Sequence, residues 1–465
     1  MSARNHDSKG RRVSCQRRRL IDTAGTAWSS LLKEMGVLSR IVECLKDEVG
    51  TWRERRYGPL TTLVMFIGQV MNADQSCQDA VARETARSQG TRGTNTGSYC
   101  KARQRLPLRL IERLGPDIGE RLRQKQPHHW CWRGREVKLI DGTTVSMPDT
   151  KSNQARFPQS RTQKAGLGFP VARLLAVVSL SCGAVLEWMA GPCEGKGSGE
   201  TSMLWKLAGG LRSGDVVLAD RYYAGYFMLA RLMGCGVDIV VRQHQLRRTD
   251  FRRGKRLGKC DHLVEWPRGP RPAWMDQETY AAMPERLTLR EVRVGNWIIV
   301  SSLRNVREVS RRELSDLYQQ RWQVELDLRS IKSVMQMDIV RCLSPGMVVK
   351  EIAVHLLAYN LVRTAMGAAA RAAELHPRRL SFKGALQLLR AYEGDLAHGP
   401  ASRVGSRYDR MIRDIAANRL PHRPGRVEPR VKKRRPKSYP LMTRPRNQLR
   451  IPLTKQMDRV ISLLR

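Results

Sequence analysis

Three acidic residues occupy positions from which they could bind divalent metal ions. Asp141 follows the alternating segment Val137–Ile140, and Asp220 ends the apolar run Asp215–Asp220, so each is predicted at the carboxyl end of a strand. Open α/β sheets place their active sites at such ends. Together with Glu325, which is predicted on a later helix, these carboxylates suit Mg²⁺ or Mn²⁺. Two such ions about 3.5 to 4 Å apart can activate an attacking oxygen and stabilise a leaving one, which predicts phosphoryl transfer.

Cations surround the glutamate at helical spacing. Tyr318, Arg321, Glu325 and Lys332 are separated by two, three and six residues. At about 100° per residue, their directions on a continuous helix fall within about 60° of one another. Such a face suits a phosphate beside a metal ligand. Simpler interpretations stay open for each part: Arg321 and Glu325 are also spaced as an ordinary i,i+4 surface pair, and an aspartate after a strand is often a turn former or helix cap.

The elements that must position these residues follow from the hydrophobic periodicity. Helical spacing dominates first, period-two segments and helices then alternate, and long helices are predicted at about 308–334 and 348–373. We therefore predict an α/β protein with a mixed-sheet core, assembled from two parts of the chain. The expected domains are a basic disordered N-terminus (1–21), a helical DNA-binding domain (22–126), a catalytic core (127–243 and 302–394), a β-rich insertion (244–301) and a basic tail without a core (395–465).

Charge and composition narrow the partners. The chain has 84 Lys and Arg against 43 Asp and Glu, a net charge of +41, which favours a polyanionic partner such as nucleic acid. On charge alone, a ribosome-like or membrane-surface protein remains possible, and the basic tail either contacts DNA or is merely solvated. No apolar run reaches the roughly 18 to 20 residues of a bilayer span, and the start of the chain lacks a secretory signal. We therefore expect no membrane partner and a cytoplasmic, nucleoid-associated location.

The cysteines and histidines do not predict a zinc site. Ten cysteines are scattered without a C-x-x-C pair. The patches 128–131 and 260–262 contain both residue types, but neither has a partner pair at zinc-finger spacing.

Around the three acids, the sequence resembles the DDE transposases of bacterial insertion sequences, in particular the insertion sequence four family with its Tyr-Arg-Glu-Lys signature. The segments IDGTTV, LADRYY and LYQQRWQVELDLRSIK occur in family order, and SYCKARQRLP and KKRRPK also resemble family segments. The resemblance implies a ribonuclease-H-like core with Asp141, Asp220 and Glu325 as catalytic residues and metal ligands. It further implies two Mg²⁺ or Mn²⁺ ions per site, cleavage at the ends of an insertion sequence and joining of those ends to target DNA.

The same resemblance assigns DNA contacts. Tyr318, Arg321 and Lys332 would bind the terminal phosphates, and we expect a homodimer that brings both ends together in a synaptic complex. Trp297 stands where some relatives have a tryptophan that stacks on a flipped base, a contact that contributes roughly 1 to 3 kcal/mol. Its apolar segment, NWIIV, is equally typical of a core strand.

Two departures from the family pattern and two other functions limit these expectations. Asp220 is followed by Arg221-Tyr222-Tyr223 instead of the acidic residues of some relatives, and no helix-turn-helix is evident in the N-terminal region. A catalytically inactive DNA-binding descendant of a transposase would bind DNA in a salt-sensitive way without strand transfer. A general ribonuclease-H-like nuclease would cut DNA without regard to element ends.

Overall fold

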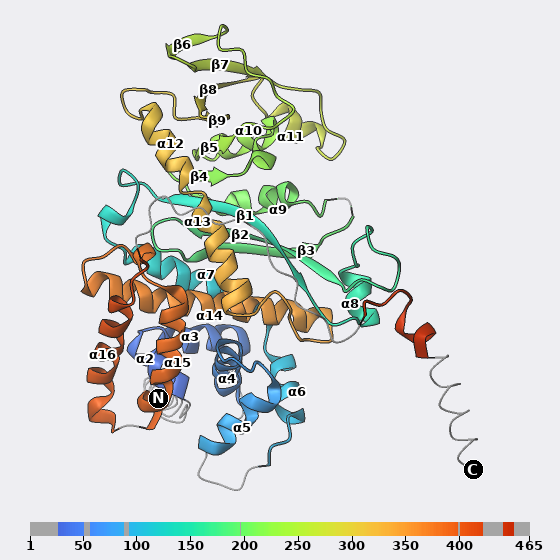
Figure 1. Ribbon diagram of the computed structural model, residues 1–465, viewed down its shortest axis with the longest axis vertical. Coiled ribbons are helices and arrows are strands. Elements are labelled where there is room, and N and C mark those ends of the chain that lie inside the picture. The colour runs from blue at the N-terminus through green and yellow to red at the C-terminus, as the bar shows by residue number, and fades with distance from the viewer. Residues whose placement is uncertain are drawn as a thin grey trace, which may run out of the picture.

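The computed structural model describes residues 27–50, 56–87, 93–195, 197–398, 400–421 and 440–450. Its centre is one nine-stranded mixed sheet with the order β3-β2-β1-β4-β5-β9-β8-β7-β6 (Figure 1). The strands are β1 (Val137–Ser146), β2 (Val171–Ser179), β3 (Val185–Pro192), β4 (Val216–Ala219), β5 (Asp238–Arg242), β6 (Lys255–Gly258), β7 (Asp261–Pro267), β8 (Arg286–Val294) and β9 (Trp297–Ser301). β1, β4 and β5 run parallel, and the other neighbouring pairs are antiparallel. The predicted mixed α/β class is therefore confirmed.

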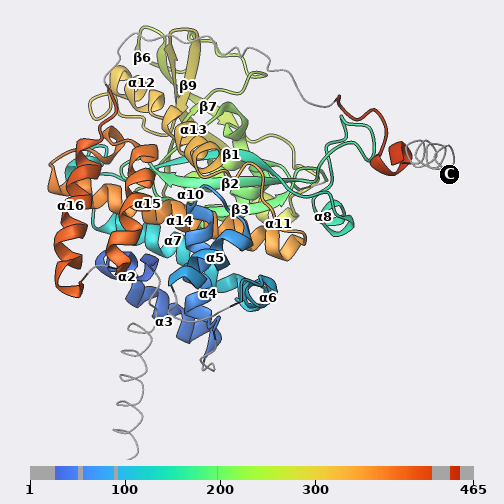
Figure 2. The same cartoon turned by 60° about the horizontal axis from the view of Figure 1, so that its bottom comes forward.

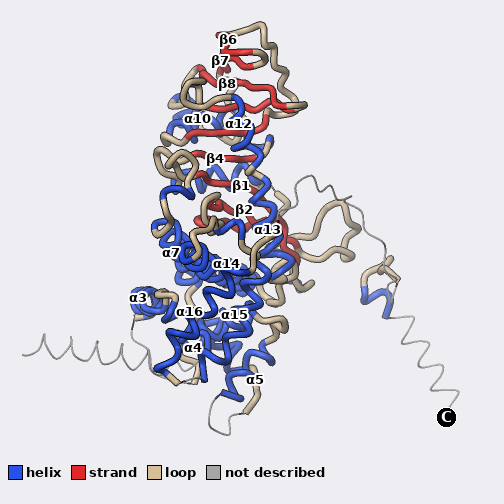
Figure 3. The backbone as a smooth tube through the Cα atoms, turned by 60° about the vertical axis from the view of Figure 1, so that its left-hand side comes forward, coloured by secondary structure: helices blue, strands red, loops and turns tan. Residues whose placement is uncertain are grey.

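The strands of segment 244–301 belong to this same sheet. β9 pairs with β5, from Val240↔Ser301 to Arg242↔Ile299, and β8, β7 and β6 follow outward. Figure 3 shows the strands as one ladder that rises away from the helical part of the protein. The segment is rich in strands, as expected, but it extends the core sheet because β9 returns to cover the edge that β5 would otherwise expose.

Helices pack on both faces of the sheet and below it (Figures 1 and 2). Those before the sheet are α2 (Ala27–Glu34), α3 (Leu38–Val49), α4 (Pro59–Met71), α5 (Cys77–Arg87), α6 (Gly97–Arg105) and α7 (Leu108–Gln124). Those within or after it are α8 (Lys151–Arg156), α9 (Glu200–Leu207), α10 (Tyr226–Gly234), α11 (Gln277–Ala281), α12 (Arg311–Gln319), α13 (Trp322–Arg329), α14 (Pro345–Ala372), α15 (Phe382–His398) and α16 (Val404–Ala417). Short 3-10 turns and one π-helical turn, η4 (Ser330–Val334), connect several of them.

Side-chain alternation divides the core into two layers. Leu139 and Leu218 point to the larger layer, which also holds the apolar side chains of α12, α13 and α14. Ile140 and Ala219 point to the opposite layer, which is covered by α9 and α10. Successive residues of a strand face opposite sides. A residue two positions after Leu139 or Leu218 therefore faces the same layer as that leucine.

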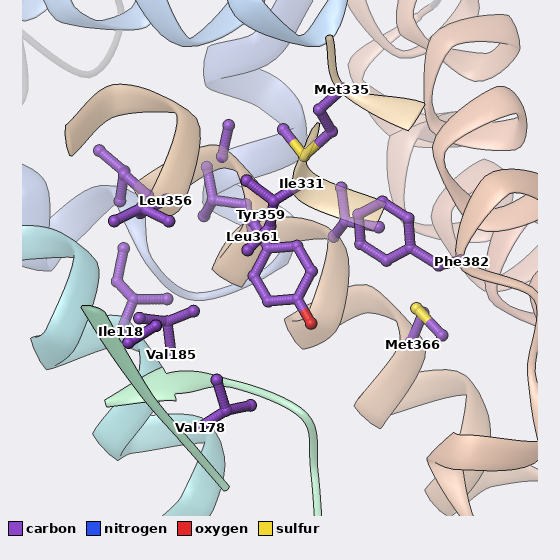
Figure 4. Packing of buried hydrophobic residues seen from close by; sticks show 14 of the residues in the cluster. Ile118, Val178, Val185, Ile331, Met335, Leu356, Tyr359, Leu361, Met366 and Phe382 are labelled. Carbon is purple, nitrogen blue, oxygen red and sulfur yellow. The ribbon is translucent and has the colours of Figure 1, made fainter. Parts of the chain in front are cut away.

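Helix α14 is the central element of the larger layer. Tyr359 lies between the sheet residues Val178 and Val185 on one side and Phe382 of α15 on the other (Figure 4). Its ring stacks on Phe382 at 5.1 Å, and its hydroxyl donates to the carbonyl oxygen of Gly183 at 2.9 Å. By length and composition α14 could cross a bilayer, but most of its apolar window is buried inside the protein, as in a core helix.

The C-terminal segment differs from the expectation of a tail without a core from residue 395. Helix α16 lies inside that segment and buries Met411, Ile412 and Ile415. It packs against α14, α15 and α2. The helical spacing of these apolar residues is hidden by the arginines between them, which is why basic composition alone was misleading. The expected N-terminus 1–21 and the basic stretch 432–437 lie outside the described residues.

Candidate active site

Asp141 and Asp220 occupy equivalent positions on neighbouring parallel strands. The last paired residues of β1 and β4 are Leu139↔Leu218. Each aspartate comes two residues later, so both are at the same level and face the larger core layer, as the leucines do. Neighbouring strands lie roughly 4.8 Å apart, which brings the two carboxylates side by side.

One part of the prediction is wrong: Asp141 does not end its strand. β1 continues to Ser146 through its antiparallel pairing with β2, where Asp141 lies opposite Ala176. The shorter strand β4 does end before Asp220, which caps the 3-10 turn Arg221–Tyr223 and accepts a hydrogen bond from the Arg221 amide at 2.6 Å. β4 therefore ends just before Asp220, while β1 continues past Asp141.

The carboxyl group of Asp141 is largely buried. Burial, and to a lesser extent the negative charges of Glu200 and Glu325, raise its pKa to about 6. A hydrogen bond from the Gly142 amide, at 2.9 Å, and the positive charge of Arg321 act in the opposite direction. Because burial is the main cause of the shift, a cation beside the carboxylate would stabilise its charged form.

Glu325 reaches the site from helix α13, which packs against β1 (Figure 1). Its Oε1 accepts a hydrogen bond from the Arg321 guanidinium at 2.8 Å. Arg321 interacts electrostatically with Asp141 and Asp220 as well. The three acids thus share one arginine.

The long helix predicted over about 308–334 is interrupted. α12 ends at Gln319, and the chain tightens there, because the amides of Gln320 and Arg321 donate to carbonyl oxygens three residues earlier. Side chains three residues apart eclipse in such a turn, which keeps Tyr318 and Arg321 on one side. At the other end, the π-helical turn η4 replaces the α-helix and carries Lys332. The four signature residues therefore do not share the face of one continuous helix.

A buried ion network fixes α13 from its opposite side. Asp327 is fully buried and accepts hydrogen bonds from Arg363 of α14 and, at 2.7 Å, from Arg378. Arg378 also donates to the carbonyl oxygen of Ser179 at the end of β2. Asp327 lies two residues after Glu325, so this network holds the helix that presents the glutamate.

Trp297 is not a core residue. Its side chain is 44% exposed. Its ring meets Tyr318 edge-on at 6.4 Å, and the Arg242 guanidinium lies over it at 5.0 Å. Burial raises the pKa of Tyr318 to about 12, so its phenol stays protonated. Trp297 and Arg242 form an aromatic and basic surface over the buried Tyr318. This surface lies beside Asp220, because Asp220 and Arg242 are equivalent on the parallel strands β4 and β5, whose last pair is Ala219↔Val241.

Lys332 lies farther from the acids. It lies seven positions after Glu325, which corresponds to about 10 Å along a helix axis. It is partly exposed on η4. The structure thus places Asp141, Asp220, Glu325, Tyr318 and Arg321 together, with Trp297 beside them and Lys332 at the far end of α13.

The donor set suits a hard divalent cation, although its present geometry is not that of a bound site. Three carboxylates and no sulfur or imidazole favour Mg²⁺ or Mn²⁺ over zinc. Within the described residues, however, no group of three or more His, Cys, Asp or Glu side chains is arranged to hold a metal ion. Glu325 uses Oε1 for its hydrogen bond with Arg321, and it would complete the donor set with Asp141 and Asp220.

Comparisons with known proteins identify the family of this chain. The transposase DDE domain model matches residues 132–361, which include all three acids. The transposase InsG of insertion sequence element IS4 from Escherichia coli (strain K12) is 26% identical over 418 residues, which cover 86% of this chain and 91% of InsG. This chain is a DDE transposase of the insertion sequence four family. A solved synaptic complex of the piggyBac transposase with hairpin DNA aligns over 84% of either chain, with a TM-score of 0.40 and 11% identity.

Two residues of this transposase site were missed in the sequence. Arg242 lies beside Asp220 because of the register in which β4 and β5 pair. No sequence motif indicates that register. Glu200 begins α9, and its carboxylate lies against Gly142 from the other face of β1. The signal for Glu200 was an acidic residue in the first turn of a predicted helix, which is ordinarily explained by the helix dipole alone.

Proposed function

We propose that this DNA transposase cuts at the ends of an insertion sequence and joins them to target DNA by two-metal phosphoryl transfer. The observation that carries the proposal is the matched position of Asp141 and Asp220 on parallel strands beneath the helix that presents Glu325. Within a ribonuclease-H-like core, these three carboxylates would hold the ions. When bound, two divalent ions would activate the attacking water or 3′-hydroxyl and stabilise the leaving oxygen.

Arg321 has a role at each stage of this proposal. Arg321 pairs with Glu325 and compensates part of the charge of Asp141 and Asp220. With Glu325 as a ligand of a metal ion, the Arg321 guanidinium would be available to a phosphate group. A planar guanidinium binds phosphate oxygens in pairs, which suits the scissile phosphate.

The surrounding residues would position the DNA end. Tyr318 and Arg321 would contact the terminal phosphates, Lys332 a phosphate farther along, and Trp297 an unpaired base. The exposed face of Trp297 and the nearby Arg242 support stacking beside a phosphate. We further propose a homodimer, in which two copies hold the two ends in one synaptic complex.

Single substitutions of the acids test this function. Asp141→Ala, Asp220→Ala and Glu325→Ala should each abolish Mg²⁺-dependent cleavage of cognate end DNA while DNA binding persists. Asp316→Ala on α12 is the matched control, because Asp316 is exposed and forms only a 3.9 Å pair with Arg312. Cleavage by any of the three variants would refute the assignment. Equal cutting of end and random DNA would instead indicate a general nuclease, and binding without cutting by the unmodified protein would indicate an inactive descendant.

A further inference from the structure

Glu200 lies beneath the candidate site, on the opposite side of the sheet from Asp141. A Cβ atom placed on Gly142 would lie 2.3 Å from the carboxyl carbon and Oε1 of Glu200. Since Asp141 and Gly142 are successive strand residues, their side-chain directions point to opposite faces. The Glu200 carboxylate therefore packs directly against the β1 backbone below Asp141, in space that only glycine leaves open.

The same carboxylate is tied to the segment that follows Asp220. The Tyr223 hydroxyl donates to Glu200 Oε2 at 2.9 Å, and the Tyr223 side chain is almost fully buried. Tyr223 ends the 3-10 turn that Asp220 caps. One side chain thus contacts the backbone beside the first aspartate and, through a tyrosine, the turn that holds the second.

Electrostatic interactions connect Tyr223 to Glu200 and to both aspartates. Burial raises the pKa of Tyr223, and the negative charges of Glu200, Asp141 and Asp220 raise it further. The phenol is therefore a protonated donor whose hydrogen bond to a carboxylate is charge-assisted, which is the stronger kind. A hydroxyl held in this way has little freedom to turn, and neither has the 3-10 turn that carries it.

We propose that Glu200 is a positioning residue that fixes the spacing of Asp141 and Asp220 for divalent ions, through its packing under Gly142 and its hydrogen bond with Tyr223. The inference rests on the proposed function. Some relatives have acidic residues at the position of Tyr223. Here the acidic side chain is that of Glu200, which comes from α9 on the opposite side of the sheet and binds the Tyr223 hydroxyl. Residues that orient metal ligands without binding the ion typically change metal affinity or activity by about 10- to 100-fold when they are removed.

Electron paramagnetic resonance measures Mn²⁺ binding to the full-length protein without DNA. This readout is independent of cleavage. Glu200→Ala and Tyr223→Phe should each weaken Mn²⁺ binding about tenfold. Glu200→Gln keeps an acceptor for the tyrosine hydroxyl and should recover most of that loss. The double variant Glu200→Ala/Tyr223→Phe should bind no more weakly than Glu200→Ala, because the two residues act through one contact.

A control separates this role from general stability. Glu187→Ala removes another partly buried glutamate, which lies against Gly210, and should bind Mn²⁺ as the unmodified protein does. Wild-type affinity in both Glu200→Ala and Tyr223→Phe would overturn the inference, and so would a Glu200→Gln variant as weak as Glu200→Ala. Melting temperatures show whether Glu200→Ala keeps its fold. If it does not, the Mn²⁺ affinity of Tyr223→Phe, which lacks only one oxygen atom, tests the inference. Failure of the unmodified protein to cut end DNA would refute the proposed function. The Mn²⁺ measurements do not test that function and test only the role of Glu200.

Discussion

The buried carboxylate of Asp141 should make the metal-free protein less stable than a neutral variant. Burial, followed by the charges of Glu200 and Glu325, raises its pKa from 3.8 to about 6. At about 1.36 kcal/mol per pKa unit, ionisation of this group costs the folded state up to about 3 kcal/mol near neutral pH. We expect about 1 to 3 kcal/mol, because water reaches part of the side chain. Asp141→Asn should therefore raise the free energy of unfolding at pH 7.5 by this amount while abolishing cleavage.

The pH dependence follows from the direction of the shift. The folded carboxyl has the higher pKa, so the folded state holds its proton more tightly than the unfolded state does. Its contribution to stability is fully present below about pH 3.8 and is lost as the pH rises through about 6. The stability difference between Asp141→Asn and the unmodified protein should accordingly grow from pH 4 to pH 6 and then stay constant.

Urea denaturation between pH 4 and pH 8, in the presence of a chelator, measures this difference. Asp316→Asn, which makes the same chemical change at an exposed position, should show no comparable trend. Added Mg²⁺ should stabilise the unmodified protein and leave Asp141→Asn unchanged, because ligands stabilise only a state that binds them. An Asp141→Asn variant that is less stable than the unmodified protein at pH 7.5 would refute the reasoning about burial.

Three other substitutions test how the site is supported and how it meets DNA. Asp327→Ala leaves two buried arginines without their carboxylate and should lower the free energy of unfolding by about 3 to 5 kcal/mol, measured by urea denaturation. Trp297→Ala should weaken binding of end DNA with an unpaired terminal base by about 1 to 3 kcal/mol, measured with a fluorescent base analogue at that position. Lys332→Ala should lower the slope of log affinity against log salt by about one, measured by titration at several salt concentrations.

The tryptophan substitution has a matched control variant, and each of the other two substitutions has an outcome that would contradict it. Trp274→Ala removes another exposed tryptophan, which packs against Trp205, and should leave binding of the unpaired base unchanged. An equal loss in both tryptophan variants would argue against specific stacking. An unchanged salt slope for Lys332→Ala would remove that lysine from the phosphate contacts, and an Asp327→Ala loss below about 1 kcal/mol would mean that the arginines find water.

The strands around the site were predictable because their apolar patterns are strong and their ends are marked. The strand expected before Asp220 is found as β4, which ends at Ala219. Asp141 was misplaced within its strand because Gly142 follows it, and a glycine after an acidic residue is typical of a turn. In the structure, Gly142 is instead the place where another side chain approaches the strand. Local sequence cannot distinguish these two uses of glycine.

The interruption of the signature helix was not predictable from periodicity. Leu314, Leu317, Val324 and Leu328 are all buried in one layer, so the apolar pattern continues across the break. No proline or glycine occurs between Arg311 and Val334 to mark it. The tightened turn at Arg321 and the π-helical turn at Lys332 change the directions of the two cations without moving an apolar residue out of the core, and only tertiary packing records such a change.

The residues that were missed share one cause, which also bears on the chemistry. Arg242 and Glu200 reach the aspartates through neighbouring strands and through the opposite face of the sheet. Near Asp141 and Asp220 the structure therefore sets two more carboxylates, Glu200 and Glu325, against the guanidinium of Arg321. Arg321 interacts with all three acids and is paired with Glu325. A divalent ion would relieve the repulsion and free the arginine for phosphate in a single exchange, so we expect metal binding and DNA-end binding to strengthen each other by the same factor.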